Sequence, residues 1–366
     1  MKKNALVGVG IAGLGFGESV HLPALESNED ANQIALWHPN SEKLESSCQR
    51  NNLIGYKNWN SLLNDEQVDG IIIATPPAPR FELAKEALKA GKHLLLEKPI
   101  TLNTSQAEEL QRLAINNRLS VAVDFEYRAV PLFMTLKKIL QEKQIGDIWF
   151  VKFDWLMSSR ANTARPWDWY SQKEEGGGVI GALGTHAFDI LHWLFGPTNT
   201  IKSHLSTSIP NRLCPKTNLQ KRVTSEDICL AQIGLTETES NKTIPVQLSL
   251  SAITRQGRGC WVEIYGSDGT IVIGSNNQKD YVHGFGLWIA EKDGPLKSIS
   301  ADKNFSFNKS WKDGRIAPVA RIQSWWIESI RSGKPIIPGL AEGVASQKVS
   351  DKIKESHDSG LQVNLS

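Results

Sequence analysis

The sequence predicts an α/β protein. We expect an N-terminal Rossmann domain, with a doubly wound parallel sheet, followed by an α+β domain with a large, mostly antiparallel open sheet. From residue 5 to about residue 124, short apolar runs alternate with helical stretches, as in a parallel sheet covered on both faces. After residue 125, longer runs alternate apolar and polar residues, as strands do when helices cover one face of an antiparallel sheet. Because 366 residues exceed what one core usually fills, we expect domains over 1–124 and 125–366.

Five apolar runs are the predicted strands of the first domain: ALVGVGIA, QIALWH, VDGIIIATPP, KHLLLEKP and SVAVDF. The stretches FELAKEALKAGK and SQAEELQRLAINN have helical spacing, and Gly91 stands where the first of them should end. The run HLLLEKPI ends in Glu97, Lys98 and Pro99. Ligands of such sheets bind outside the carboxyl ends of the strands. We therefore expect Lys98 to lie beside the ligand.

The second domain is predicted to begin with a helix over VPLFMTLKKILQ, followed by the alternating strand IWFVKFDWLM. A glycine-rich turn opens a helix in GGGVIGALGTHAFDILHWLFG, and strands follow in VQLSLSAITR, CWVEIYGSDGTIVIG and GLWIAEK. Residues 236–243, TETESNKT, are interpreted as an exposed hairpin loop. A final helix is predicted over 341–358. Packing of this helix against the first domain is one possible arrangement.

Charge and cysteine content exclude several classes of function. Lysine plus arginine (41) nearly balances aspartate plus glutamate (39), giving a net charge of +2 without a basic run, so no nucleic-acid partner is expected. No apolar stretch approaches the ~20 residues of a membrane span. His186 and His192 lack a third ligand at suitable spacing, so no metal site is predicted. The cysteines form no CxxC pair, which argues against structural zinc and favours a reducing cytoplasm; they are Cys48, Cys214, Cys229 and Cys260.

Two overlapping matches to the dinucleotide-binding pattern GxGxxG occur near the N-terminus. The better match starts at Gly8 and would lie inside the first strand, whereas a phosphate loop must follow the strand and open the helix. We therefore favour Gly13 for the tight turn and Gly15 for the close approach of backbone N–H groups to a pyrophosphate. Glu18 replaces the third glycine, and Gly17 could supply the room needed there. The predicted loop residues are Gly13, Gly15, Phe16 and Gly17.

The end of the second predicted strand favours NADP over NAD. An acidic residue normally holds the ribose 2′-OH of NAD at this point, but ALWHPNSEK has none from residue 36 to residue 41. An ordinary polar loop is the alternative interpretation. The residues that could instead meet a 2′-phosphate are His38, Asn40, Ser41 and Lys43.

Four segments, in their order and spacing, resemble the Gfo/Idh/MocA family, named after glucose-fructose oxidoreductase, inositol dehydrogenase and MocA. They are GLGFGESVHLPAL, IIIATPP, AGKHLLLEKPI and GGGVIGALGTHAFDILHWLFG, and the resemblance covers nearly the whole chain. It implies an NAD(P)-dependent oxidoreductase that acts on CH–OH groups of sugars or cyclitols and often dimerises through its open sheet. It also implies cofactor contacts from Ala74, Thr75 and Pro76, while Arg80 stands where many relatives carry histidine.

The resemblance implies that Lys98 projects toward the nicotinamide and the substrate, with Glu97 supporting it and Pro99 shaping the turn. An ammonium partly buried near a positive nicotinamide is disfavoured in its charged form. Lys98 could therefore lose a proton near neutrality and hydrogen-bond the reacting hydroxyl. A surface lysine at a strand end is the alternative.

The family pattern also places a histidine, and an aspartate four residues before it, on one helix face as proton-transfer partners. His186 matches the histidine, but the earlier position is Ala182. Asp189 shares a helix face with His186 and could orient its imidazole, although a core histidine is the alternative. The missing acid leaves open a relay of Lys98 and His186 alone, a substitute acid, or a protein that binds cofactor but turns over poorly. The candidate substitutes are Asp168, Tyr170, Asp124 and Tyr127.

The segment SSRANTARPWDWYSQKEEGGG precedes the His186 helix. Aromatic faces with an acid suit a polyol, and arginines suit a carboxylate or phosphate. Core or interface packing is an equally open interpretation. The predicted substrate residues are Tyr127, Arg165, Trp167, Asp168, Trp169, Tyr170 and Asp189, with Arg160 nearby.

The apolar strands of the second domain predict self-association, as a homodimer or homotetramer. Hydride transfer to or from a sugar-like substrate, with Lys98 and His186 in proton transfer, is the leading functional hypothesis. Two others stay open: an NAD-dependent glycoside-cleaving enzyme that oxidises its substrate transiently, and a nucleotide-dependent binding protein, which Ala182 would suit.

Overall fold

The structure, a computed structural model, describes residues 6–237, 241–277 and 281–365, which form two compact units. The first unit combines residues 1–129 with 309–347, and the second combines residues 130–308 with 348–366. The predicted boundary after residue 124 lies close to the end of the first segment. Segment 309–347, which we expected in the second domain, belongs instead to the first unit. The predicted final helix is α10 (Leu340–Ser359), which contributes residues to both units.

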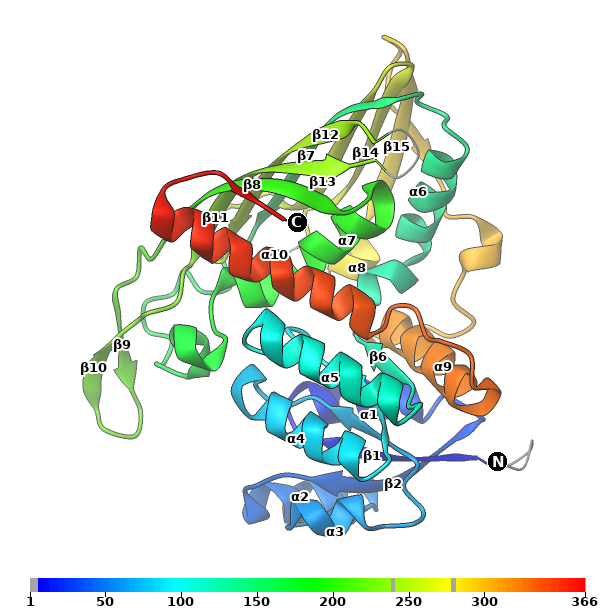
Figure 1. The fold of residues 1–366 in the computed structure, drawn as a ribbon, viewed down its shortest axis with the longest axis vertical. Coiled ribbons are helices and arrows are strands. Elements are labelled where there is room, and N and C mark those ends of the chain that lie inside the picture. Colours follow the sequence, from blue (N-terminus) through cyan, green and yellow to red (C-terminus); the bar gives the residue numbers. More distant parts are fainter. Residues whose placement is uncertain (1–5, 238–240, 278–280, 366) are drawn as a thin grey trace. The chain divides into compact units, whose positions relative to one another are not determined.

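Six parallel strands form the sheet of the first unit within the described residues, in the order β3-β2-β1-β4-β5-β6 (Figure 1). This is the doubly wound order that the alternating sequence pattern predicted, with the topological switch between β1 and β4. Five strands match the predicted apolar runs. The short β3 was not predicted, because two of its three residues are exposed and leave no apolar run. The strands are β1 (Val7–Ala12), β2 (Ala31–Trp37), β3 (Ile54–Tyr56), β4 (Gly70–Ile73), β5 (His93–Leu96) and β6 (Val121–Val123).

Helices cover both faces of this sheet, and successive strand residues point into two different cores. Ile71 and Leu94 join one core, whereas Ile72 and Leu95 join the other. Helices α3, α4 and α5 contribute to the first core, and α1, α2 and α9 contribute to the second. The helices are α1 (Leu22–Leu25), α2 (Ser41–Asn51), α3 (Trp59–Leu63), α4 (Pro77–Lys89), α5 (Thr104–Asn116) and α9 (Ile316–Ser332), with a π-helical turn over Gly17–His21 and a 3-10 turn over Glu126–Ala129.

Helix α9 was not predicted, and its packing explains why segment 309–347 belongs to the first unit. Trp326 is fully buried against the sheet. A Cβ atom added at Gly70 of β4 would lie only 2.8 Å from the Trp326 ring, so the indole occupies the space that a side chain at Gly70 would need. Helix α9 is therefore an integral part of the unit built on the six-stranded parallel sheet, although it lies far along the chain.

A mixed, mostly antiparallel sheet forms the second unit, as predicted. Its nine described strands follow the order β16-β15-β14-β13-β7-β12-β11-β8-β17, and only β7 and β12 pair in parallel. The strands are β7 (Ile148–Leu156), β8 (Thr198–Ser206), β11 (Ile228–Thr236), β12 (Thr243–Ser251), β13 (Gly259–Gly266), β14 (Gly269–Ser275), β15 (Gly286–Glu291), β16 (Lys297–Ile299) and β17 (Val363–Asn364). A separate hairpin pairs β9 (Asn211–Cys214) with β10 (Leu219–Arg222).

One face of the large sheet is covered and the other is open. Along β12 and β11 buried and exposed residues alternate, and helices α6 (Pro131–Gln141) and α7 (Thr185–Phe195) pack on the covered side (Figure 1). On the other side lie Leu230, which is 47% exposed, and the stacked pair Trp261 and Trp288. The predicted hairpin loop joins β11 to β12, but its residues 238–240 lie outside the described part of the chain.

The remaining short helical segments of the second unit are α8 (Tyr281–Gly284), a π-helical turn over Ile180–Gly184, and 3-10 turns over Trp169–Ser171, Lys173–Glu175 and Lys303–Phe305. Of the helices that the structure describes, none has the length and apolar character needed to cross a bilayer.

Candidate active site

The turn after β1 is built from glycines with different structural requirements. Gly13 has φ of +102°, and a Cβ atom there would lie 2.6 Å from the carbonyl oxygen of Ala74, so only glycine fits. At Gly17 a Cβ atom would lie 3.0 Å from Cγ2 of Ile11. Gly17, rather than the next residue, thus gives the close approach between helix and strand. At Gly15 an added Cβ would meet nothing within 4 Å, so internal packing does not require that glycine.

The other side chains of this turn have partners within the first unit. Glu18 accepts hydrogen bonds from Arg50 at 2.8 Å and Asn51 at 3.0 Å. The Phe16 ring makes an edge contact with the His21 ring, with centroids 5.4 Å apart. The guanidinium of Arg315 lies 5.3 Å from the centre of the Phe16 ring. As expected, the rejected glycine match lies inside β1, because Gly8 is a residue of that strand.

The polar residues after β2 partly serve the start of α2. Asn40 caps this helix, its Oδ1 accepting from the Lys43 backbone N–H at 2.9 Å. His38 Nδ1 accepts from the Asn40 backbone N–H at 3.0 Å. The side chains of Ser41 and Lys43 are exposed. Asn40, one of the four residues predicted to meet a 2′-phosphate, therefore already uses its side-chain oxygen to cap α2.

The carboxyl ends of β4 and β5 are joined by Arg80, a buried residue of α4. Its guanidinium donates to the backbone carbonyls of Thr75, Glu97 and Pro99, at 2.8 Å for Glu97. Burial lowers the pKa of Arg80 to about 10, although the nearby Glu97 carboxylate opposes this shift. Lys98 directly follows Glu97 in the sequence. It is half-buried and is joined to Pro99 by a cis peptide bond. Arg80 thus holds together the two strand ends that carry the predicted cofactor contacts.

Thr75 lies in the predicted cofactor segment, between Ala74 and Pro76. Its Oγ1 atom is buried, and among the residues that the structure describes it has no hydrogen-bond partner. Because a buried hydroxyl usually finds a partner, this atom is available to a bound molecule.

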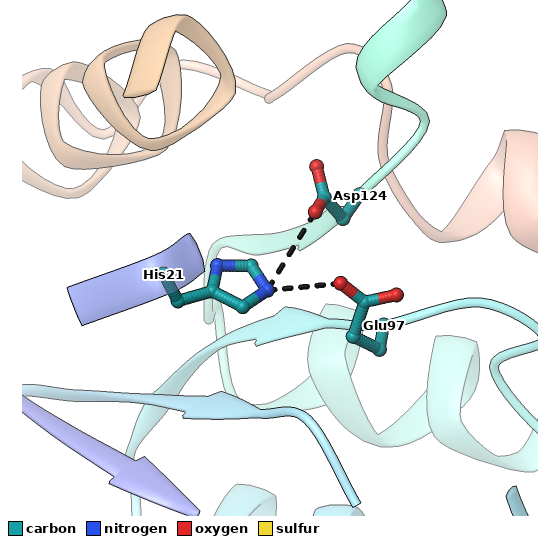
Figure 2. A group of neighbouring side chains, drawn as sticks. All are labelled: His21, Glu97 and Asp124. Atoms are coloured by element: carbon teal, nitrogen blue, oxygen red, sulfur yellow. Dashed lines mark hydrogen bonds and ion pairs between the residues drawn. The ribbon is translucent and has the colours of Figure 1, made fainter. Parts of the chain in front are cut away.

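A cluster of three buried side chains lies next to Lys98: His21, Glu97 and Asp124, which we call the acid cluster (Figure 2). His21 Nε2 is 2.9 Å from Glu97 Oε1 and 3.6 Å from Asp124 Oδ2. On the other side of the imidazole, Gln323 Nε2 of α9 donates to the His21 carbonyl oxygen at 3.0 Å and lies 3.2 Å from Nδ1. Sequence reasoning missed His21, whose only signal was its position in the helical segment that follows the glycine turn.

The environment separates the pKa values of the carboxyls near Lys98. Burial alone would raise the pKa of Glu97, but the hydrogen bond from His21 and the charges of Lys98 and Arg80 lower it to about 2. Burial, together with the negative charges of Glu97 and Glu126, raises the pKa of Asp124 well above its ordinary value. Burial also raises the pKa of Glu126 to about 7, while Lys98 opposes that shift. Near neutral pH, Glu97 is therefore ionised, whereas the pKa of Asp124 is displaced in the opposite direction, toward the protonated form.

The predicted proton-transfer histidine belongs to the second unit, whereas Lys98 belongs to the first. His186 lies at the start of α7 and is buried, with its ring 6.2 Å from the Trp155 ring. Asp189, on the same helix, is also buried. Ala182 lies in the π-helical turn before α7 and is half-buried. The structure thus distributes the two predicted catalytic residues over two separate units.

Within the predicted substrate segment, Asp168 and Tyr170 have local structural roles. Asp168 Oδ1 accepts from the Tyr170 backbone N–H at 3.0 Å and so caps a 3-10 turn. The guanidinium of Arg160 lies 3.8 Å from the centre of the Tyr170 ring and pairs with Asp168 at 3.4 Å. Burial raises the pKa of Tyr170, against the opposing charge of Arg160. Tyr127, by contrast, is buried in the first unit.

The other residues of this segment are more exposed. Trp167 donates from its indole N–H to the carbonyl of Arg222 at 3.0 Å, and so packs on the β9–β10 hairpin. Arg165 is exposed and donates to the carbonyl of Ser159 at 2.8 Å. Trp169 is 37% exposed. Their predicted role in substrate binding stays a prediction.

Comparisons with known proteins agree with this architecture. The family described as "Oxidoreductase family, NAD-binding Rossmann fold" matches residues 7–125, and its "C-terminal alpha/beta domain" matches residues 137–365. An uncharacterized oxidoreductase of Synechocystis sp. is 40% identical over 359 residues, which cover 98% of this chain and 95% of that protein. Glucose-6-phosphate 3-dehydrogenase of Bacillus subtilis is 22% identical over 364 residues, or 98% of each chain. The solved structure of levoglucosan dehydrogenase in complex with NADH and L-sorbose has a TM-score of 0.85 at 21% identity, covering 99% of both chains.

Proposed function

Since the chain belongs to the Gfo/Idh/MocA oxidoreductase family, we propose that it transfers a hydride between a nicotinamide cofactor and a sugar, cyclitol or related hydroxy or carbonyl compound. The observation that carries this proposal is the position of Lys98 directly after β5, beside the turns that follow β1 and β4. Ligands of doubly wound sheets bind at this edge. The names of two similar proteins, levoglucosan dehydrogenase and glucose-6-phosphate 3-dehydrogenase, support a sugar-like substrate.

The residues after β1 and β4 fit a dinucleotide. The backbone at Gly15 is exposed and has free space where a side chain would stand, so the N–H groups of this turn can approach a pyrophosphate. The buried Thr75 hydroxyl lacks a partner among the described residues and can hydrogen-bond the same ligand. When bound, the nicotinamide supplies the hydride-accepting or hydride-donating carbon.

We favour NADP over NAD as the cofactor. No acidic side chain follows β2 between residues 36 and 41, where a carboxylate would be expected to hold the ribose of NAD. Because Asn40 caps α2, the groups proposed to meet a 2′-phosphate are narrowed to His38, Ser41 and Lys43. The ammonium of Lys43 and the imidazole of His38 suit a phosphate dianion.

Lys98 and His186 are the proposed proton-transfer groups. In the oxidation direction, Lys98 Nζ accepts the proton of the substrate hydroxyl as the carbonyl group forms, and in reduction it returns that proton. Because Ala182 provides no carboxylate, His186 acts with Asp189 as the acidic residue on its own helix. General acid–base catalysis of this kind contributes roughly 10²–10⁴-fold to the rate.

The proposal is tested by titrating the protein in parallel with NADPH and NADH, following nicotinamide fluorescence, and then screening sugars and polyols for turnover. Lys98→Ala should lower kcat by at least ~100-fold while nucleotide affinity is retained. The matched control is Lys85→Ala, which removes a lysine of the same unit that pairs with Glu109 at 2.8 Å; it should leave turnover unchanged. His38→Asp should weaken binding of NADPH relative to NADH.

Two results would contradict the proposal. One is that neither nucleotide binds and that none is released when the protein is denatured. The other is that Lys98→Ala retains the full turnover of the unsubstituted protein.

A further inference from the structure

The acid cluster and its neighbour Gln323 come from four parts of the first unit. His21 ends the π-helical turn after β1, Glu97 and Asp124 follow β5 and β6, and Gln323 lies on α9. The exposed fractions of His21, Glu97 and Asp124 are 0%, 8% and 0%. Side chains this deeply buried cannot be ordinary solvated charges, and they need either partners or neutralisation.

The hydrogen bonds around His21 assign its proton. Gln323 Nε2 is a donor, and it lies 3.2 Å from His21 Nδ1, so Nδ1 is the accepting nitrogen. Nε2 then carries the N–H and donates to Glu97 Oε1 at 2.9 Å. At 3.6 Å, Asp124 Oδ2 is too far for a hydrogen bond to this nitrogen. In the described part of the chain, no N–H or O–H donor of another residue type reaches either carboxyl oxygen of Asp124, whereas a hydrogen bond between the Asp124 and Glu97 carboxyls is one cause of the raised pKa of Asp124.

The charges facing the cluster come from five neighbouring elements. The acidic groups are Glu97, Asp124 and Glu126, and the cationic groups are Lys98 after β5, Arg80 on α4, and Arg315 beside Glu126. One ring nitrogen of His21 and one carboxyl oxygen each of Glu97 and Asp124 all lie within 4.8 Å of one another. Two buried carboxyls at this separation do not readily ionise together. The His21 hydrogen bond favours the charge on Glu97, which leaves the proton on Asp124.

We propose that His21 and Asp124 are positioning residues for Lys98. His21 holds Glu97 as a fixed carboxylate beside Lys98, and Asp124 stands behind it as a neutral carboxylic acid. The inference rests on the proposed function in taking Lys98 as the reactive group. It also assigns a role to an acid next to Lys98, in a chain that has Ala182 at the position of the family's aspartate.

Substitutions at His21 separate this role from simple packing. His21→Leu removes the donor to Glu97, so the pKa of Glu97 should rise and the acid limb of the kcat/KM profile should move up by about one pH unit or more. His21→Gln keeps an N–H donor and should restore most of the original profile. The matched control is His93→Gln, which changes another histidine of the same unit, at the start of β5, where its ring accepts from the Ser120 backbone N–H at 2.9 Å. It should leave the profile in place.

Substitution at Asp124 tests the neutral acid directly, without turnover. Asp124→Asn replaces a carboxylic acid by a neutral group of the same shape. Infrared spectra at pH 7 should show a protonated carboxyl C=O band that this variant lacks. Its kcat/KM profile should shift by less than about half a pH unit.

The inference fails if the infrared band is absent, if Asp124→Asn displaces the profile as the loss of a charge would, or if His21→Leu keeps the original profile. It also fails if the protein holds one equivalent of a divalent metal that Asp124→Asn releases. Failure of the proposed function is distinguishable, because it appears as full turnover in Lys98→Ala, whereas the infrared band does not depend on turnover.

Discussion

Alanine substitutions at the three glycines after β1 should separate stability from nucleotide binding. Gly13 has φ of +102°, which costs an L-residue about 1–2 kcal/mol, and its Cβ would also lie 2.6 Å from a backbone oxygen. Gly13→Ala should therefore destabilise the first unit by about 3 kcal/mol or more. Gly17→Ala places its Cβ 3.0 Å from Ile11 Cγ2 in a buried site, and such overpacking typically costs about 1–3 kcal/mol.

Gly15→Ala should behave differently. Its Cβ meets nothing within 4 Å, so the stability should change by less than about 1 kcal/mol. The same methyl group would stand where the pyrophosphate is proposed to approach, and nucleotide affinity should fall by at least about tenfold, or about 1.4 kcal/mol.

The assay combines urea unfolding with nicotinamide-fluorescence titration for each variant. The expected order of destabilisation is Gly13→Ala, then Gly17→Ala, then Gly15→Ala, with the loss of affinity largest relative to stability in Gly15→Ala. If Gly15→Ala is as unstable as Gly13→Ala, the turn packs differently from the structure. If it binds nucleotide normally, the phosphate loop has been assigned to the wrong residues.

Three further predictions concern the ends of β4, β5 and β6. Arg80→Lys keeps the charge, but one ammonium cannot bond all three backbone carbonyls that the guanidinium bonds. The free energy of unfolding, measured in urea, should therefore fall by about 2–4 kcal/mol. A decrease below about 0.5 kcal/mol would contradict this role of Arg80. The folded-state pKa of Glu97 lies at about 2, below the usual 4.5, so its contribution of about 3 kcal/mol is present above pH 4.5 and is lost as the pH falls toward 2. Glu97→Gln should remove this acid sensitivity from the unfolding midpoints, and an unaltered slope would argue against the shift. The pKa of Asp124 is raised on folding, so the stability of the unsubstituted protein should decrease as the pH rises above the ordinary carboxyl range. The Asp124→Asn variant should therefore gain stability relative to the unsubstituted protein as the pH rises toward neutrality. A stability difference between the two proteins that stays constant from pH 4 to pH 8 would refute the assignment.

Local sequence patterns were sufficient for the elements that carry the site. The apolar runs before Ala74 and Glu97 predicted β4 and β5, because strands buried on both faces need almost only apolar residues. Lys98 was correctly expected at a strand end, since the charge follows such a run directly. Gly13 was chosen over the stricter motif match on its position relative to β1 alone, and the structure has β1 end just before it.

Long-range packing could not be predicted in the same way. The amphipathic pattern of α9 is consistent with a helix but does not say which sheet the helix covers, and Trp326 reaches Gly70 across most of the chain. The acid cluster also depends on long-range packing, because His21 and Asp124 come together only when β1 and β6 are placed in one sheet. Single-residue patterns likewise could not distinguish a substrate-binding Asp168 from one that caps a turn.

The late position of α9 has a consequence for synthesis of the protein. All six strands of the first sheet lie within residues 7–123 and leave the ribosome early, and N-terminal segments generally begin to fold first. Val9, Ile72 and Leu95 nevertheless face the core that α9 completes, so the nascent chain displays an uncovered apolar surface until residues 316–332 have been translated. The first unit therefore cannot complete its folding during translation until helix α9 has been synthesised. A fragment truncated near residue 129 should be a client of chaperones and a poor choice for isolated expression.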